Sequence, residues 1–317
     1  MPFAHIPVLL NEVLEGLAIK ADGIYVDATF GRGGHSRAIL ERLGPQGRLY
    51  ALDRDLEAIE ASKAIADPRF HIAHSPFSKI KSVCEDFGIC GKVDGILMDI
   101  GVSSPQLDDA SRGFSFDRDG PLDMRMDQSA KLDAATIVNT YSQKELAYIF
   151  KVYGEERFAS KVAAAIVRER EKQPFDRTLQ LSELIKRTIP GWNENKHKAT
   201  RCFQALRIAV NAELDELRAA LDQCVDVLND HGRLCVISFH SLEDRIVKNF
   251  IKDKARGQEV PPSIPLTFEQ IEQLRLSTAT MEPVGGAIKA SDAELQQNVR
   301  SRSATLRVSS RMERQNK

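Results

Sequence analysis

A set of glycines between a short apolar segment and an amphipathic one constrains this chain more than any other feature. Residues 23–28 are typical of a buried strand, residues 36–43 are typical of a helix, and Gly31, Gly33 and Gly34 lie between them. Glycine readily adopts positive φ angles and has no β-carbon to hold a ligand away from the backbone. The sequence therefore predicts a strand, a glycine turn that binds a ligand, and the start of a helix.

Neighbouring residues narrow the class of ligand. The dinucleotide fingerprint Gly-x-Gly-x-x-Gly fails because Ser36 stands where its third glycine belongs, and the Gly-Lys-Ser/Thr of nucleoside triphosphate sites is missing. Asp27, which precedes the turn, is typical instead of S-adenosylmethionine-dependent methyltransferases; an ordinary strand-to-helix turn and a nucleotide site remain alternatives. Asp53, about twenty residues further on at a second strand end, is placed to bind a ribose diol. Asp55 competes for that role, and a solvated strand end is the simpler interpretation.

Strand-like and helix-like segments alternate along the first part of the chain. Strands are expected near residues 24–28, 48–53, 69–73 and 94–99, and helices near 35–43 and 55–65. This alternation predicts an α/β fold with a parallel, doubly wound, Rossmann-like sheet.

Helix signals dominate the middle of the chain before the strand pattern returns at residues 232–239. We expect a capping box from Ser142 to Glu145, helices near 155–171 and 180–188, and a crossover helix near 205–228. Residues 303–309 are expected to pair at the sheet edge, and residues 253–300 to be mostly loop. The chain is therefore predicted to form an α/β domain from residues 1–109 and 208–317, interrupted by an all-helical insertion at residues 110–207.

Composition limits the class of protein. With 317 residues, 42% of them hydrophobic, the chain has room for two domains. Its five cysteines form no Cys-x-x-Cys pair and are odd in number, which favours reduced thiols in the cytoplasm and argues against zinc or another metal. A basic, apolar leader and an apolar run of transmembrane length are both missing, so we expect a cytoplasmic protein without a membrane partner. The sequence leaves a homodimer open.

Positive charge is concentrated in two segments although the net charge is only −1. Residues 151–207 contain thirteen Lys and Arg against seven Asp and Glu, and residues 298–317 contain six against one. Such tracts are usually solvated faces, and binding of nucleic-acid phosphates is the alternative.

The fourth predicted strand ends in an acid, where open α/β sheets bind their ligands. Asp99 is followed by small residues, a proline and Gln106, whereas methyltransferases that act on amines carry Asp/Asn-Pro-Pro-aromatic there, so the aromatic is missing. The lone pair of an exocyclic amine is delocalised into its ring, and a carboxylate that accepts its N–H bonds favours the reactive form. Asp99 is our candidate for this catalytic role; a cofactor contact and a strand cap are the alternatives.

Longer motifs resemble the bacterial 16S rRNA cytosine-N4 methyltransferase family over nearly the whole chain. They are Asp99 to Asp109, Arg112 to Phe116, Asp119 to Asp127, His197 to Ile208 and Ser238 to Val247, with the glycine turn Gly31 to His35. The resemblance implies a class I methyltransferase domain with a helical insertion and S-adenosylmethionine as methyl donor. It implies as acceptor N4 of one cytidine, position 1402, in the decoding region of small-subunit ribosomal RNA, with an assembled 30S particle as partner.

The resemblance also implies a set of cofactor contacts: Gly33, Gly34, His35, Asp53, Phe77, Asp99 and Gln106. Backbone amides of the turn would hold the methionine part, Asp53 the ribose, Phe77 the flat adenine, and Asp99 and Gln106 the reacting end. Phe77 is otherwise expected in the core, and the His35 imidazole is otherwise expected to cap the following helix.

Proteins bind single-stranded RNA by stacking aromatic and arginine side chains on its bases. Six residues are candidates, each with a structural role as the alternative: Phe114, Phe116, Arg201, Arg207, His240 and Arg245. Three other functions compete with RNA methylation. A non-enzymatic ribosome-assembly factor would not need the glycine turn together with Asp53 and Asp99. Ser36 disfavours a nicotinamide-dependent oxidoreductase. Amino methylation of DNA would use much the same chemistry, and only the family resemblance favours RNA over DNA as the substrate.

Overall fold

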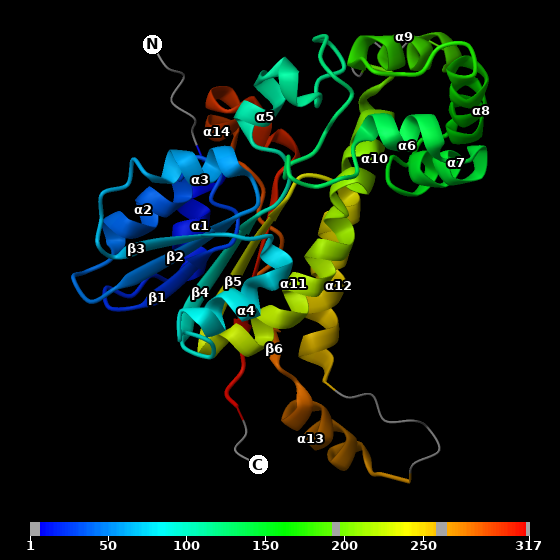
Figure 1. Cartoon of the computed structure of the whole chain (residues 1–317). Coiled ribbons are helices and arrows are strands. Elements are labelled where there is room, and N and C mark those ends of the chain that lie inside the picture. The colour runs from blue at the N-terminus through cyan, green and yellow to red at the C-terminus, as the bar shows by residue number, and fades with distance from the viewer. Residues whose placement is uncertain (1–6, 192–196, 258–264, 315–317) are drawn as a thin grey trace. The chain divides into compact units, whose positions relative to one another are not determined.

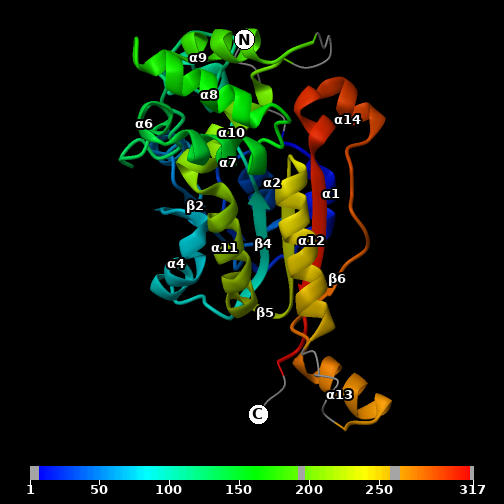
Figure 2. The ribbon, with the colours of Figure 1, turned by 90° about the vertical axis from the view of Figure 1, so that its right-hand side faces the viewer.

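A computed structural model describes residues 7–191, 197–257 and 265–314 (Figures 1 and 2). The chain forms two compact units, which we call the sheet unit (Met1–Gly101 and Leu214–Lys317) and the helical unit (Val102–Glu213). The helical unit starts eight residues before, and ends six residues after, the predicted insertion at 110–207. Gly101 has a φ of 114° and Ala212 a φ of 49°, so both transitions coincide with an unusual backbone conformation.

The sheet unit is built on seven strands in the order β3-β2-β1-β4-β5-β7-β6. Their bounds are β1 Ile24–Asp27, β2 Arg48–Asp53, β3 Phe70–His74, β4 Val93–Asp99, β5 Leu228–Ser238, β6 Met281–Pro283 and β7 Thr305–Arg311. Strands β1 to β5 are parallel, as predicted, and β7 is antiparallel to both of its neighbours. Residues 303–309 were predicted to pair in the sheet, and β7 does so. Its predicted place at the edge was wrong, because β6, a three-residue strand ending in proline, lies beyond it.

Helices cover both faces of this sheet (Figures 1 and 2). The helices of the sheet unit are α1 Leu10–Leu17, α2 Gly34–Arg42, α3 Leu56–Ser62, α4 Ile80–Asp86, α11 Glu213–Val227, α12 Ser241–Arg256, α13 Phe268–Thr278 and α14 Asp292–Gln297, with 3-10 turns at Phe77–Lys79 and Val299–Ser303. Of these, α13 projects away from the sheet. Successive strand residues point to opposite faces: Leu97 packs with Leu17 of α1, whereas Ile96 and Met98 pack with Leu221 of α11. This alternation buries the centre of the sheet on both sides.

The helical unit contains the elements predicted for the insertion and two short turns before them. Its helices are α5 Ser104–Asp108, α6 Ala134–Thr140, α7 Gln143–Val152, α8 Ala159–Arg170, α9 Thr178–Thr188 and α10 Thr200–Asn211, with a 3-10 turn at Ala110–Arg112. The capping box of Ser142 and Glu145 is present at the start of α7, and the helices predicted near 155–171 and 180–188 are α8 and α9. Apolar side chains such as Phe150, Ile166 and Leu206 form a core of its own.

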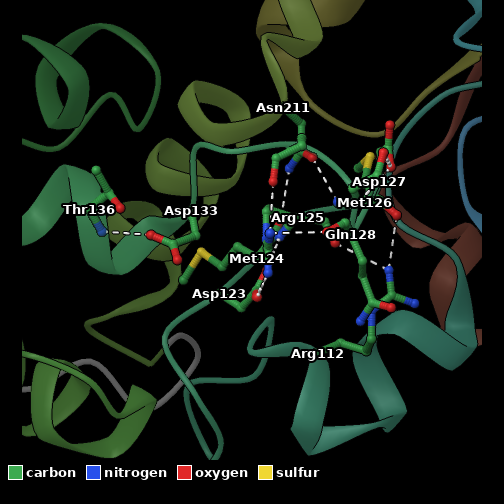
Figure 3. Close-up of polar contacts among 12 residues, drawn as sticks. Arg112, Asp123, Met124, Arg125, Met126, Asp127, Gln128, Asp133, Thr136 and Asn211 are labelled. Carbon is green, nitrogen blue, oxygen red and sulfur yellow. Dashed lines mark hydrogen bonds and ion pairs between the residues drawn. The ribbon is translucent and has the colours of Figure 1, made fainter.

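Buried polar side chains fix the irregular segment before α6 (Figure 3). The Asn211 amide donates to the carbonyl of Met124 and accepts the N–H of Met126, both at 2.8 Å. Arg112, only 2% exposed, donates to the carbonyls of Arg125 and Met126 at 3.1 and 3.0 Å. Backbone groups that no helix or strand satisfies thus find side-chain partners inside the unit.

Two other sequence predictions were wrong, and a helix was missed. The helix expected near 205–228 is two helices, α10 and α11, separated by Ala212. The positive φ of Ala212 ends α10, and no glycine or proline in the sequence marks this break. Residues 253–300, expected as loop, contain the end of α12 and all of α13 and α14; residues 258–264 lie outside the described part. Helix α1 was not predicted at all. None of the helices in the described ranges is long and apolar enough to cross a bilayer.

Candidate functional site

Three neighbouring parallel strands of the sheet unit end in an aspartate. Asp27 ends β1, Asp53 ends β2 and Asp99 ends β4, and the register pairs Asp27 with Ala51 of β2 and Leu97 of β4. Burial raises the pKa of each of the three carboxyl groups from its ordinary value to about 6. The sheet thus gathers at one edge three carboxylates whose charged form is disfavoured.

Asp27 is almost fully buried and joins the strand to the helix that follows the glycine turn. Its carboxylate accepts the Ser36 hydroxyl at 2.6 Å and the Thr29 backbone N–H at 3.1 Å. These hydrogen bonds favour the charged form but only partly offset the effect of burial on its pKa. Ser36, whose presence excluded the dinucleotide fingerprint, therefore holds α2 against β1.

Asp53 shapes the glycine turn directly. Its carboxylate accepts the N–H of Gly31 at 2.7 Å and the N–H of Asp55 at 2.8 Å, one on each oxygen. Each oxygen keeps a further lone pair for a ligand hydroxyl. The competing residue Asp55 is the N-cap of α3, where its side chain accepts the N–H of Glu57 at 3.0 Å. The geometry favours Asp53 over Asp55 as the ribose acceptor.

The glycines of the turn differ in what their missing β-carbons permit. A β-carbon on Gly33, whose φ is 75°, would lie 2.7 Å from the Phe30 ring, and one on Gly34 would lie 2.5 Å from Pro7. Protein atoms therefore fill the space beside both residues. At Gly31, with a φ of 58°, the nearest atom would be 4.0 Å away, so this part of the turn is open. Gly34 and His35 begin α2, whose first N–H groups have no partner within the helix and favour an anionic ligand group such as a carboxylate.

Asp99 and His35 face each other across the end of the sheet. The Nε2 of His35 lies 2.9 Å from the carbonyl of Val8, which can only accept a hydrogen bond, so Nε2 carries a proton. Its Nδ1 lies 3.7 Å from Oδ2 of Asp99. Oδ1 of Asp99 is buried and has no hydrogen-bond partner among the described residues, although the side chain as a whole is 24% exposed. A donor on the ligand would satisfy this oxygen.

Phe77 begins the 3-10 turn Phe77–Lys79 that follows β3. Its side chain is half-buried and packs against the core on the α4 and α11 face of the sheet. Ser75, two residues earlier, donates its backbone N–H to the carbonyl of Asp53 at 2.9 Å, which ties this segment to the end of β2. Phe77 therefore combines a core contact with a partly exposed ring.

His240 lies at the end of β5, and a residue that the sequence analysis missed lies beside it. Glu243 is fully buried; its Oε2 accepts the N–H of Phe239 at 2.8 Å, and its Oε1 lies 2.9 Å from Nε2 of His240. The charge of Glu243 also raises the pKa of Asp99. The three-residue spacing of His240 and Glu243 at a helix start is that of a capping box, the one sequence signal that pointed to it. Arg245 is exposed on α12.

The remaining candidates belong to the helical unit and include two aromatic residues. Gln106 is buried and its Oε1 accepts the N–H of Ser103 at 2.9 Å, which caps α5. Phe114, 5% exposed, is part of the core of this unit. Phe116 is partly exposed and stacks on the His197 ring, with centroids 4.7 Å apart and an interplanar angle of 11°.

Two arginines of α10 differ in their surroundings. Arg207 forms a bidentate ion pair with Glu213 at 2.7 and 2.8 Å, and Glu213 is only 4% exposed. Arg201 is exposed in the first turn of the helix. The side chain of Arg207 therefore stabilises its own unit, and Arg201 presents its charge to solvent.

The strand order with one antiparallel strand, and the acids at the ends of β1, β2 and β4 beside a glycine turn, define a Rossmann-like sheet of the class I methyltransferase type. A model of the MraW methylase family matches residues 2–312, so the chain belongs to this family. It is 53% identical over 98% of both chains to a protein of Shewanella amazonensis. It is 52% identical to one of Legionella pneumophila strain Corby, over 97% of this chain and 99% of the relative. Both relatives are called ribosomal RNA small subunit methyltransferase H.

Membership of this family makes the chain a methyltransferase with S-adenosylmethionine as its cofactor. The residues at the sheet edge fit that molecule, which carries a sulfonium and an ammonium cation. Positive charge nearby would favour the ionised forms of Asp27, Asp53 and Asp99, whose pKa values burial raises. The open oxygen of Asp99 and the remaining lone pairs of Asp53 would be available as acceptors for N–H and O–H groups of such a ligand.

Proposed function

We propose that this methyltransferase modifies the exocyclic N4 of one cytidine, position 1402, in the decoding region of 16S ribosomal RNA within the small subunit. The names of the relatives in Shewanella and Legionella support small-subunit ribosomal RNA as the substrate. The proposal that an amine is methylated rests on Oδ1 of Asp99, which could accept an N–H of that amine. This oxygen is buried at the end of β4 and lacks a hydrogen-bond partner among the described residues. The RNA substrate places the reaction in the cytoplasm.

Asp99 would act on the nucleophile rather than on the methyl group. The amine lone pair is delocalised into the cytosine ring, and an acceptor for an N–H bond favours the form in which the lone pair points at the methyl carbon. Only the ionised carboxylate of Asp99 offers this acceptor on both oxygens. Its pKa of about 6 leaves it mainly ionised at neutral pH. The His35 imidazole, whose Nδ1 lies 3.7 Å from Oδ2 of Asp99, bounds the space on that side of the carboxylate.

The bound S-adenosylmethionine supplies an electrophilic methyl group, and the chain supplies its position. Asp53 would hold the ribose hydroxyls, the first N–H groups of α2 from Gly34 and His35 the carboxylate of the methionine part, and the Phe77 ring the adenine. In-line transfer demands orientation above all, which rigid contacts from strand ends provide.

Exposed residues are the stronger candidates for RNA contacts. Arg201, Arg245 and Phe116 present charge or ring area to solvent. His240 follows the carboxyl end of β5 and lies beside Glu243, whose charge acts on Asp99. Phe114 and Arg207 are held inside the helical unit, so we propose structural roles for both. The helical unit as a whole would be the insertion that contacts the small subunit.

The test is transfer of label from S-adenosylmethionine to small ribosomal subunits that lack this modification, followed by digestion of the RNA to nucleosides. We expect N4-methylcytidine to be the only labelled nucleoside. Asp99→Asn should reduce the rate at least about a hundredfold, and Asp86→Asn, an exposed aspartate at the end of α4, serves as the matched control. Labelling of another atom, or full activity of Asp99→Asn, would refute the assignment.

A further inference from the structure

A cavity that the cofactor site does not use lies in the sheet unit beside α12. It has a volume of about 440 Å³, which is within the usual range for ligand pockets. Among the described residues that line it none is acidic and five are cationic: Lys248, Lys252, Arg256, Arg275 and Arg307. Its remaining walls are apolar side chains and two glycines of the loop after β6.

The sequence builds this row of charge on one face of a helix. Lys248, Lys252 and Arg256 follow each other at intervals of four residues along α12, so their α-carbons extend over about 12 Å. Like charges at this spacing slightly destabilise a helix. The opposite wall is open: a β-carbon on Gly285 or Gly286 would have no neighbour within 4 Å in the described structure.

The five cations differ in how far the protein pairs their charge. Arg307 of β7 forms a bidentate ion pair with Asp244 at 2.7 and 3.0 Å, one turn of α12 before Lys248. Lys248 and Lys252 are exposed and have neither an ion pair nor a hydrogen bond within the described ranges. Nε of Arg275 donates to the carbonyl of Arg256 at 3.2 Å, so α13 closes the far end. An anion in the cavity would relieve the mutual repulsion of these cations.

We propose that this cavity binds phosphate groups, and that its ligand is the sugar-phosphate backbone of RNA. A row of about 12 Å is longer than a single phosphate requires. Phe268 is 81% exposed and lies two turns before Arg275 on the same face of α13, where its ring can stack on a base. RNA as the ligand rests on the proposed function; a free nucleotide offers the same phosphate chemistry.

The cavity would direct RNA toward the carboxyl ends of the parallel strands, where Asp99 lies. Helix α12 begins at Ser241, directly after His240 at the end of β5, and β5 pairs with β4. Lys248 follows Ser241 by about 10 Å along the helix axis. A strand held by Lys248 and Lys252 can therefore continue along α12 to the end of β4, where Asp99 lies.

The experiment measures binding without methyl transfer, so its result does not depend on which atom the enzyme methylates. A fluorescent, unmodified single-stranded RNA of the decoding-region sequence and inorganic pyrophosphate are titrated separately into the full chain at several salt concentrations. The test variant is Lys248→Gln with Lys252→Gln. The matched control is Lys63→Gln with Lys92→Gln, two exposed lysines of the same unit. Thermal unfolding of each variant checks that it is folded.

We expect the test variant to weaken RNA binding at least about tenfold and to reduce the salt slope by about 0.7 per lost phosphate contact, while the control changes neither. Phe268→Ala should weaken RNA binding and leave pyrophosphate binding unchanged. Loss of pyrophosphate binding with unchanged RNA binding would support a phosphate site for a free nucleotide and overturn the RNA assignment. If the test and control pairs behave alike with both ligands, the phosphate site itself is refuted.

Discussion

The substitution Asp53→Asn tests two effects of one carboxylate: the free energy that its ionisation costs the folded protein, and its proposed hydrogen bond to the cofactor. The side chain accepts the N–H groups of Gly31 and Asp55, one on each oxygen. Asparagine keeps one of these acceptors, while its NH2 group turns a donor toward the other N–H. We expect the variant to fold and to bind S-adenosylmethionine poorly.

The stability effect follows from the pKa of Asp53. Burial raises this pKa from 3.8 to about 6, so ionisation at pH 7 costs the folded protein about 3 kcal/mol. A carboxyl with a raised pKa contributes its stability below pH 3.8 and loses that contribution as the pH rises through 6. The variant avoids this loss but leaves one buried N–H unpaired, which costs about 1 to 3 kcal/mol. At pH 7 the avoided ionisation cost and the cost of the unpaired N–H nearly cancel. At pH 4 only the cost of the unpaired N–H remains, so the variant should be less stable than the wild type.

Cofactor affinity should change far more. A charged acceptor contributes about 1.5 to 3 kcal/mol for each hydrogen bond to a ribose hydroxyl, so losing one weakens binding about tenfold to 150-fold at pH 7. Isothermal titration calorimetry with S-adenosylmethionine measures this change. Urea unfolding between pH 4 and pH 7 measures the stability of variant and wild type.

Asp55→Asn provides the control. Asparagine is as good an N-cap as aspartate, so α3 should keep its start and the cofactor affinity should stay within about twofold. An Asp53→Asn protein with wild-type affinity would refute the ribose contact. A stability difference between variant and wild type that stays constant from pH 4 to pH 7 would refute the argument from burial.

Three further predictions follow from single contacts. The rate of methyl transfer by the wild type should fall about tenfold per pH unit below pH 6, because protonated Asp99 no longer offers two acceptors; a rate that stays flat down to pH 5 would count against Asp99. Gly33→Ala places a β-carbon 2.7 Å from the Phe30 ring at a φ of 75°, and should lower the free energy of unfolding by about 2 kcal/mol and weaken cofactor binding. Arg112→Met removes two donors to buried carbonyls and should cost about 2 to 4 kcal/mol in urea unfolding, whereas Arg118→Met, at an exposed site, should cost under about 1 kcal/mol.

The fold was predictable where periodicity and composition agree. Strands β1, β2, β4 and β5 contribute buried side chains to the cores on both faces of the sheet. They alternate with amphipathic helices, so each appears in the sequence as an apolar run between turn residues. The break at Ala212 and the edge strand Met281–Pro283 left no such signal. The first needs only one residue of unusual φ, and the second owes its place to pairing with β7, a contact between residues about thirty positions apart.

The sequence allowed us to predict which residues lie at the strand ends of the site, but not which atoms these residues contact. A sequence shows that Asp27, Asp53 and Asp99 each end a strand, and parallel topology brings them to one edge. It does not show that Asp55 is an N-cap, or that Glu243 is fully buried close to Asp99. Those roles depend on the direction of a side chain in three dimensions.

The three strand-end carboxylates are costly for the folded chain, and the cost has a use. Burial raises the pKa of both Asp53 and Asp99, and the charge of Asp27 adds a smaller contribution, so folding holds like charges together where water solvates them poorly. We expect a cationic sulfonium bound near these acids to turn the repulsion into attraction, which would end once the methyl group has left and the sulfur is neutral. The same acids that attract the methyl donor would therefore favour release of its product, which explains why a chain would keep three destabilised aspartates beside an open glycine turn.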